Sequence, residues 1–320
     1  MNERQAHILD LVTEGHIRSA RPVPSSWIAE KLAISSATVR NEFGHLEESG
    51  YLQQPHASAG RIPTALSYTR YARKFIPPGR LPAGQQRLLV ERLRGSHGDS
   101  LMQQIAGVTA ELSGYAVVVS LPADDNLQAL EIHLSALSHS RLLAVVVLEN
   151  GLVRQLVVEL EPTPSDATLR EAESSLRPLT LPVGEVPLAL VDLARRVTED
   201  IARTYRALAE AWPGMNPPRF FSQGLRNLLS EPESNDPNFV RTALELLEGH
   251  LPSDAGPSHE NGFAVVIGEV LAQVGAPLEL GVGKGTLILL GPMRMRYPEA
   301  LMIAQGVSDT VAERESLGLS

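Results

Sequence analysis

The chain has 320 residues and a formal net charge of −9 at pH 7. This length allows two or three domains, and a hydrophobic fraction of 43% is ordinary for a globular protein. Because there is no cysteine, disulfides, thiolate metal sites and cysteine nucleophiles are excluded, which fits a cytoplasmic protein. No apolar run approaches the ~20 residues that span a bilayer, so we expect no membrane association.

The charge is distributed unevenly along the chain. Residues 1–80 carry ten basic and seven acidic side chains, a net of +3, whereas the remainder has a net of −12. From Arg61 to Arg80 there are five basic residues and no acidic ones. Because attraction to phosphate acts over about one Debye length, roughly 10 Å, local charge decides binding to nucleic acid. The N-terminal region is therefore the candidate for an anionic partner.

The N-terminal region begins with two predicted helices. Residues 3–19 show the spacing of apolar side chains that is typical of an amphipathic helix. Ser25 or Ser26 can then cap a second, short helix, which ends before a tight break at residues 33–34. A third helix after such a break completes a helix-turn-helix layout.

The third helix, from residue 35, has two distinct faces. Ser35 or Ser36 can cap its free backbone N–H groups, and Gly50 stands where a left-handed residue would end it. The apolar residues of the inward face recur at i, i+4 and i+7: Val39, Phe43 and Leu46. The other side chains can donate hydrogen bonds: Thr38, Arg40, Asn41 and His45. Arginine suits guanine or phosphate and asparagine suits adenine, so this helix could enter a DNA major groove.

A two-stranded wing is predicted directly after this helix. Residues 51–54 and 61–64 can pair across a tip in which Gly60 permits a tight turn. His56, Ser58 and Arg61 would lie in or beside that tip, within reach of the DNA backbone. Helices and wing together predict a winged helix-turn-helix. Two alternatives stay open: a domain that binds protein instead of DNA, and an Arg61 that pairs with a carboxylate of its own domain.

Beyond a predicted linker at residues 77–84, the pattern alternates between helices and strands. Helices are expected at 85–93, 101–112, 165–176, 188–212, 219–229, 237–250 and 298–315. Strands are expected at 116–121, 127–137, 141–148, 152–160, 263–270, 278–282 and 285–290.

The order of these elements suggests one α+β domain with a helical insertion. Strands and a helix come first, an almost purely helical block spans residues 183–251, and strands then return. Asn150–Gly151 is a strong hairpin signal, which makes neighbouring strands antiparallel and disfavours a parallel doubly wound sheet. A body made of consecutive domains is the alternative.

Sequence motifs for catalysis or metal binding are missing. Residues 281–286, GVGKGT, lack the spacing of a Walker A loop and predict a turn between strands. The histidines have no metal-ligand spacing, and there is neither an HExxH nor a G-x-S-x-G motif. We therefore expect no enzyme, no cofactor and no metal.

Two segments carry a resemblance to a known family. Residues 35–41, SSATVRN, and 54–64, QPHASAGRIPT, look like the SSATIRN and QPHTSAGRIPT motifs of the HrcA family, the bacterial heat-inducible transcription repressors. Ala57 replaces a threonine of that wing motif. Residues 291–297, GPMRMRY, resemble the family's GPTRMDY segment, with Met293 and Arg296 in place of threonine and aspartate.

The resemblance implies a fold and its domains. It implies an α+β multidomain protein in which a GAF-like domain is interrupted by a helical inserted dimerisation domain. The domains are expected as follows: a winged-helix DNA-binding domain at 1–80, a linker helix at 81–100, a GAF-like domain at 101–182 and 255–320, and the insertion at 183–254.

The resemblance also implies a function. It implies a homodimeric repressor of heat-shock genes in the bacterial cytoplasm, which binds double-stranded DNA at an inverted-repeat CIRCE operator and is kept active by a GroEL-type chaperonin. The residues expected to bind DNA are Ser35, Ser36, Thr38, Arg40, Asn41, His45, His56, Ser58, Gly60 and Arg61. The alternatives are a winged-helix regulator controlled by a small molecule in the GAF-like domain, and an enzyme with an attached regulatory domain.

Overall fold

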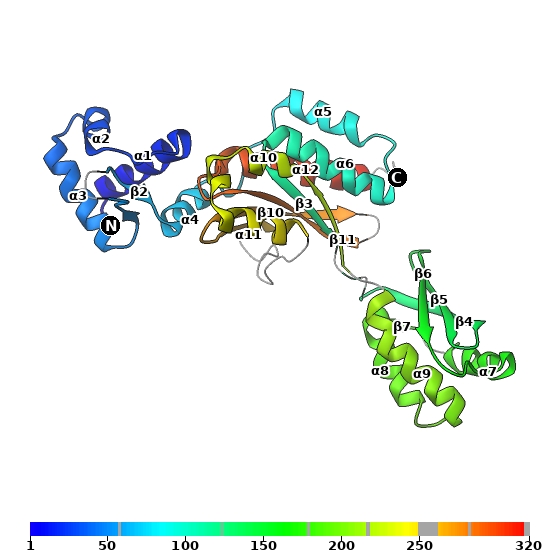
Figure 1. Ribbon diagram of the computed structural model, residues 1–320. Helices are drawn as coiled ribbons and strands as arrows, with labels where there is room; N and C mark the ends of the chain where they lie inside the picture. Colours follow the sequence, from blue (N-terminus) through cyan, green and yellow to red (C-terminus); the bar gives the residue numbers. More distant parts are fainter. Residues whose placement is uncertain are drawn as a thin grey trace. The chain divides into compact units, whose positions relative to one another are not determined.

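A computed structural model describes residues 1–56, 59–121, 123, 125–177, 180–215, 218–248, 262–280 and 283–316. The chain divides into two compact units (Figure 1): Met1–Leu121 together with Phe220–Ser320, and Pro122–Arg219. No helix in the described ranges is long and apolar enough to cross a membrane.

The first unit begins with the helices and wing that the sequence predicts. Their bounds are α1 (Glu3–Ser19), α2 (Ser25–Leu32), α3 (Ser36–Glu48), β1 (Leu52–Gln53) and β2 (Ile62–Pro63). The two strands pair antiparallel, with Leu52 opposite Pro63. One apolar cluster joins the three helices to the wing, and it includes the predicted inward face of α3: Val39, Phe43 and Leu46. Burying each such side chain contributes about 1.5–3 kcal/mol.

One of the two predicted serine caps in this region is confirmed and the other is wrong. Ser35 precedes α3, and its side chain accepts a hydrogen bond from the backbone N–H of Thr38. In contrast, α2 already begins at Ser25, so that Pro24 occupies the cap position and supplies no side-chain hydrogen bond. Proline fixes its own φ near the value that the chain needs at this entry, which places the start of α2 earlier than expected.

The rest of the first unit is a five-stranded sheet covered by helices on both faces. Its strand order is β8 (Arg219–Gln223), β3 (Ala116–Leu121), β11 (Gly283–Pro292), β10 (Leu271–Leu280), β9 (Ala264–Ile267). The helices are α4 (Ala65–Arg73), α5 (Ala83–Leu93), α6 (Gly98–Ser113), α10 (Leu225–Leu229), α11 (Pro237–Leu247) and α12 (Tyr297–Ser316).

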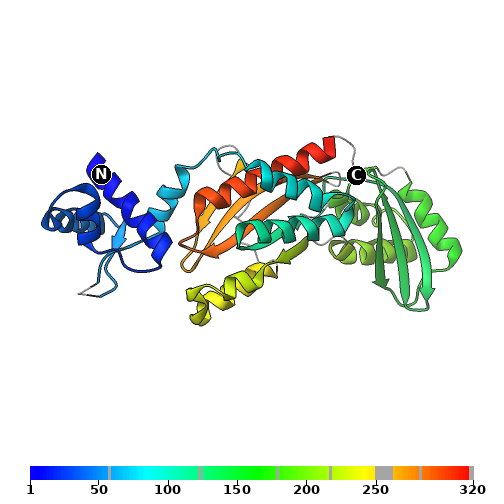
Figure 2. The ribbon, with the colours of Figure 1, turned by 90° about the horizontal axis from the view of Figure 1, so that it is seen from above.

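Alternate residues of β3, which lies between β8 and β11, point into two separate cores. Val117 and Val119 belong to the cluster that includes α6 and α12, whereas Val118 belongs to the cluster that includes α11. Figures 1 and 2 show α6 and α12 along one side of this sheet and α11 on the other. The mixed α and β composition agrees with the GAF-like architecture that the resemblance implies.

The second unit has a sheet of its own, in the order β6 (Val153–Glu159), β5 (Arg141–Leu148), β4 (Gln128–Ser138), β7 (Leu181–Pro182). The helices α7 (Asp166–Leu176), α8 (Val186–Leu193) and α9 (Glu199–Ala211) share one apolar core with it. The hairpin predicted at Asn150–Gly151 joins β5 to β6, and Gly151 has the positive φ of 80° that this turn requires.

The predicted bounds of the insertion, 183–254, do not match this division. Strands β4, β5 and β6 pair with one another rather than with β3, so the second unit begins at Pro122 and contains a sheet. It ends at Arg219, and the helices α10 and α11 belong to the first unit. Periodicity indicates that a segment is a strand, but the sheet that it joins depends on residues far away in the chain.

Two helices predicted within 183–251 are also corrected. The expected helix 188–212 is split into α8 and α9, because Thr198 begins a new helix with Glu199 and Asp200 in its first turn. The expected helix 219–229 is strand β8 followed by the short α10. Gly224 separates them with a φ of +82°, which a continuous helix does not allow.

A partly buried polar contact lies at the last turn of α1. Nδ1 of His16 is 2.6 Å from the hydroxyl of Tyr68, whose ring lies 6.2 Å from that of Tyr297. Burial and, to a smaller extent, the positive charge of Arg294 lower the pKa of His16 to about 4, although Glu233 opposes the change. Neutral histidine is therefore the form that fits the folded protein.

This contact predicts a loss of stability on mild acidification. The pKa of His16 falls from 6.5 to about 4 on folding, so the unfolded chain binds more protons between these values. Stability should therefore be full above pH 6.5 and decrease as the pH falls through that window. His16→Gln keeps a hydrogen-bonding group beside Tyr68 but does not titrate. Melting temperatures at pH 7 and pH 5 should differ less for this variant than for the wild type, and equal differences would contradict the prediction.

Candidate nucleic-acid interface

The exposed face of α3 carries three of the predicted DNA-binding residues. Arg40, Asn41 and His45 are exposed, while Val39 and Phe43, on the opposite face, are buried. Nδ1 of His45 lies 3.7 Å from a carboxylate oxygen of Glu48 on the same helix. The face therefore combines groups that donate hydrogen bonds with direct access from solvent.

The residues at the start of α3, which are Ser35, Ser36 and Thr38, differ in their contacts from the exposed donors of this helix. The Ser35 hydroxyl lies 2.8 Å from the Thr38 hydroxyl and also caps the helix, so both side chains are engaged within the domain. Ser36 is the first residue of α3 and is half-buried. These residues fix the start of the helix, and the exposed donors follow one turn later.

The wing places only some of its predicted DNA-binding residues where DNA could reach them. His56 is exposed, whereas Ser58 lies outside the described residues. A β-carbon at Gly60 would lie 2.2 Å from the carbonyl oxygen of Val23. The backbone of Arg61 exchanges two hydrogen bonds with Val23, at 2.8 and 2.9 Å, and brings the chain this close. Gly60 is thus required by the approach of two backbones, rather than by the turn that the sequence suggested.

The side chain of Arg61 lies inside the domain. It is 16% exposed, and its Nη2 is 2.8 Å from Oε2 of Glu47 on α3. Its guanidinium carbon lies 6.0 Å from the centre of the Phe43 ring. The geometry supports the alternative in which Arg61 pairs with a carboxylate of its own domain. Glu47, which sequence reasoning did not single out, is that partner, and only its position in the fold reveals it.

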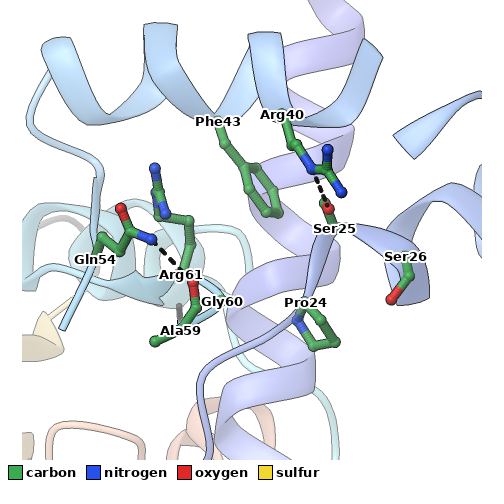
Figure 3. A pocket seen from close by; sticks show the side chains of 9 residues that line it. All are labelled: Pro24, Ser25, Ser26, Arg40, Phe43, Gln54, Ala59, Gly60 and Arg61. Carbon is green, nitrogen blue, oxygen red and sulfur yellow. Dashed lines mark hydrogen bonds between the residues drawn. The ribbon is translucent and has the colours of Figure 1, made fainter. Parts of the chain in front are cut away.

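A groove of about 480 Å³ separates the start of α2 from α3 and the wing (Figure 3). The residues that line it are Pro24, Ser25, Ser26, Arg40, Phe43, Gln54, Ala59, Gly60 and Arg61. There is no carboxylate among them. Nε of Arg40 donates a hydrogen bond of 3.4 Å to the Ser25 hydroxyl, and the amide of Gln54 donates one of 3.1 Å to the Ala59 carbonyl. Sequence reasoning missed Gln54 and assigned Ser25 or Ser26 to a helix cap.

Among the described residues, no group of three or more histidine or acidic side chains is arranged to hold a metal ion. The strongest polar cluster elsewhere is Arg294, whose Nε lies 2.7 Å from Glu233 and which also pairs with Glu231. These charges compensate one another beside the sheet of the first unit.

Comparisons with known proteins agree with one another. Residues 99–301 match the family model "HrcA protein C terminal domain". The chain is 28% identical to the heat-inducible transcription repressor HrcA of Shouchella clausii, over 98% of both chains. It is 29% identical to that of Brevibacillus brevis, over 96% of this chain and 97% of the relative. A crystal structure of a hypothetical protein shares the fold over the whole of both chains, with a TM-score of 0.61 at 21% identity.

The ion pair of Arg61 predicts a role in stability. Arg61→Met leaves Glu47 partly buried without its partner, and this should lower the free energy of unfolding by about 1–3 kcal/mol. Glu47→Gln should cost a similar amount, and the double variant should cost less than the sum. Chemical unfolding of the four proteins measures this cycle. If Arg61→Met left stability unchanged and flattened the salt dependence of DNA binding, the phosphate contact first expected of Arg61 would be supported instead.

Proposed function

The chain belongs to the HrcA family, and on this premise we propose that it is a heat-inducible repressor of chaperonin and chaperone genes that binds an inverted-repeat, CIRCE-type operator. The observation that carries the proposal is the two-faced helix α3. Its apolar face is buried in the domain, and Arg40, Asn41 and His45 stand on its accessible face. The net charge of +3 over residues 1–80 favours a polyanion, although the whole chain is acidic.

Within this proposal, Asn41 reads a base. It is exposed on the N-terminal half of α3, the part of a recognition helix that usually reaches base edges. An asparagine amide can donate to and accept from adenine at the same time, which distinguishes this base from the others.

An inverted repeat calls for a two-fold protein, so we propose that the second unit forms a homodimer. The resemblance implies a dimerisation domain at residues 183–254, which includes the helix expected at 188–212. Most apolar residues of that helical stretch are buried in the unit's own core: Leu190, Ala194, Ile201, Tyr205 and Leu208, with Leu193 and Val197 packed against it. We therefore place the dimer contact on another surface.

The outward face of β5 and β6 offers that surface. Val147 pairs opposite Val153 and Leu143 opposite Val157, and Val145 between them pairs opposite Gln155, which makes a mainly apolar patch. Val153 and Val157 are 53% and 49% exposed, and β6 is an edge strand of its sheet. Exposed apolar patches of this kind mark contact surfaces. A second copy related by a two-fold axis presents the same patch, so the contact is self-complementary.

The proposal also includes a GroEL-type chaperonin that helps keep the repressor active. The family resemblance alone supports this part of the proposal. The rival is a regulator controlled by a small molecule in the GAF-like domain, and in the described part of the first unit the packed faces of β3 leave no space for such a ligand. Val117, Val118 and Val119 of β3 are fully buried, with helices packed against both faces. If purified chaperonin stimulates operator binding, the role of the chaperonin is supported. If a ligand shifts the melting temperature, the rival is supported.

Base readout by Asn41 gives a direct test of DNA recognition. Asn41→Ala should weaken binding to the organism's own chaperone-gene operator by about 1–3 kcal/mol, the value of one good base contact. The loss on a random duplex should be smaller. Asn238→Ala, an exposed asparagine on α11, serves as the matched control and should bind as the wild type does. Equal losses on the two duplexes would exclude base readout by Asn41.

The dimer surface is tested by Val157→Lys. A lysine is tolerated on an edge strand, but it places a charge in the centre of the proposed contact. Light scattering should give the mass of one 34.6 kDa chain for this variant and twice that mass for the wild type. Val90→Lys, at a valine 45% exposed on α5, should stay dimeric.

Removal of the second unit extends this test. Residues 122–219 can be replaced by a short Gly/Ser linker, because β3 and β8 are neighbours in one sheet. The shortened protein should be a folded monomer that binds the inverted repeat weakly. A dimer that still binds the operator tightly would show that the contact lies elsewhere.

A further inference from the structure

The hydroxyl of Ser25 is directed to another helix instead of capping its own. Ser25 is the first residue of α2, and the Nε of Arg40 on α3 donates a hydrogen bond to it. Apolar contacts, among them those of Ile28 and Val39, already hold these helices together in one cluster. An exposed hydrogen bond of 3.4 Å adds little to that packing. Its main effect is on the position of the arginine.

The bond leaves the terminal nitrogens of Arg40 available. Within the described part of the chain, Nη1 and Nη2 of Arg40 have no hydrogen-bond partner. Figure 3 shows the guanidinium hanging from α3 toward Ser25, at the mouth of the groove. Held in this way, the head of Arg40 turns toward the start of α2.

The charge of the groove is set by Arg40. Among the lining residues the other cation is Arg61, and Glu47 neutralises it at 2.8 Å. No lining residue carries a negative charge, so the groove has a net positive charge. Two terminal N–H groups on a planar, permanently charged head match two oxygens of a phosphate.

We propose that Ser25 is a positioning residue, which holds the Arg40 guanidinium ready for a backbone phosphate of DNA. The proposal rests on the proposed function and deepens it, because it assigns Arg40 to phosphate and leaves base readout to Asn41. Fixing a long side chain before binding reduces the conformational entropy that is lost when the complex forms.

The test is a double-mutant cycle on the full-length protein. Binding to an operator duplex and to a random duplex is measured over a range of salt concentrations for Ser25→Ala, Ser25→Thr, Arg40→Ala and Ser25→Ala/Arg40→Ala. Ser25→Ala should weaken binding to both duplexes by about two- to ten-fold, the usual cost of ordering one long side chain. Ser25→Thr keeps the hydroxyl and should restore binding. Arg40→Ala should weaken both and lower the slope of log K against log salt by about one phosphate contact.

The cycle separates positioning from a structural role. Once Arg40 is absent, Ser25→Ala should have no further effect on DNA binding. Ser174→Ala, at an exposed serine on α7 of the second unit, is the matched control and should bind as the wild type does. A loss that persists without Arg40, accompanied by a lower melting temperature, would mean that Ser25 only supports the fold.

Other outcomes overturn separate parts of the proposal. Wild-type affinity of Ser25→Ala would exclude positioning. A loss confined to the operator would assign Arg40 to a base. If the wild type bound no duplex at all, the proposed function itself would fail, and this result is distinct from all the others.

Discussion

The neighbouring positions of β3 and β8 in one sheet are the constraint on which the rest of the architecture depends. An inserted unit leaves a sheet undisturbed most easily when the chain leaves and returns at adjacent points. Here β3 ends at Leu121 and β8 begins at Arg219, side by side. The side-chain amide of Asn227, just beyond β8, donates to the Tyr115 carbonyl at the start of β3, at 3.0 Å. Gly224 lies too close to this carbonyl to carry a β-carbon. The return point is thus fixed, and the intervening chain is free to form its own core.

The division of the chain into two compact units explains how one chain can carry two kinds of contact surface. Helix α3 and the strands β5 and β6 each have one apolar face that packs inside their own unit. Their other face is not covered by described residues of that unit. In α3 the uncovered face bears hydrogen-bond donors, and in β5 and β6 it bears mainly valines and a leucine, with Gln155 among them. The chemistry of the uncovered face, rather than the fold beneath it, distinguishes a surface for DNA from a surface for another protein chain.

Internal ion pairs decide which positive charges remain for a partner. Arg61 is neutralised by Glu47, and Arg294 by Glu231 and Glu233. Arg40 is held by an uncharged hydroxyl, so it keeps its full charge. A count of basic residues therefore overstates the electrostatic attraction to DNA, because two arginines of equal formal charge contribute very differently.

The sequence by itself determined the local elements of this protein. The bounds of α1, the Ser35 cap and the turn at Asn150–Gly151 depend on residues within a few positions of one another, and periodicity or capping chemistry reveals them. The tertiary structure alone decided which strands share a sheet, where the second unit begins, and that Arg61 pairs with Glu47 while Arg40 bonds to Ser25. These features join residues that lie on different elements, and no local pattern of side chains specifies the partner of a strand edge or of a charge.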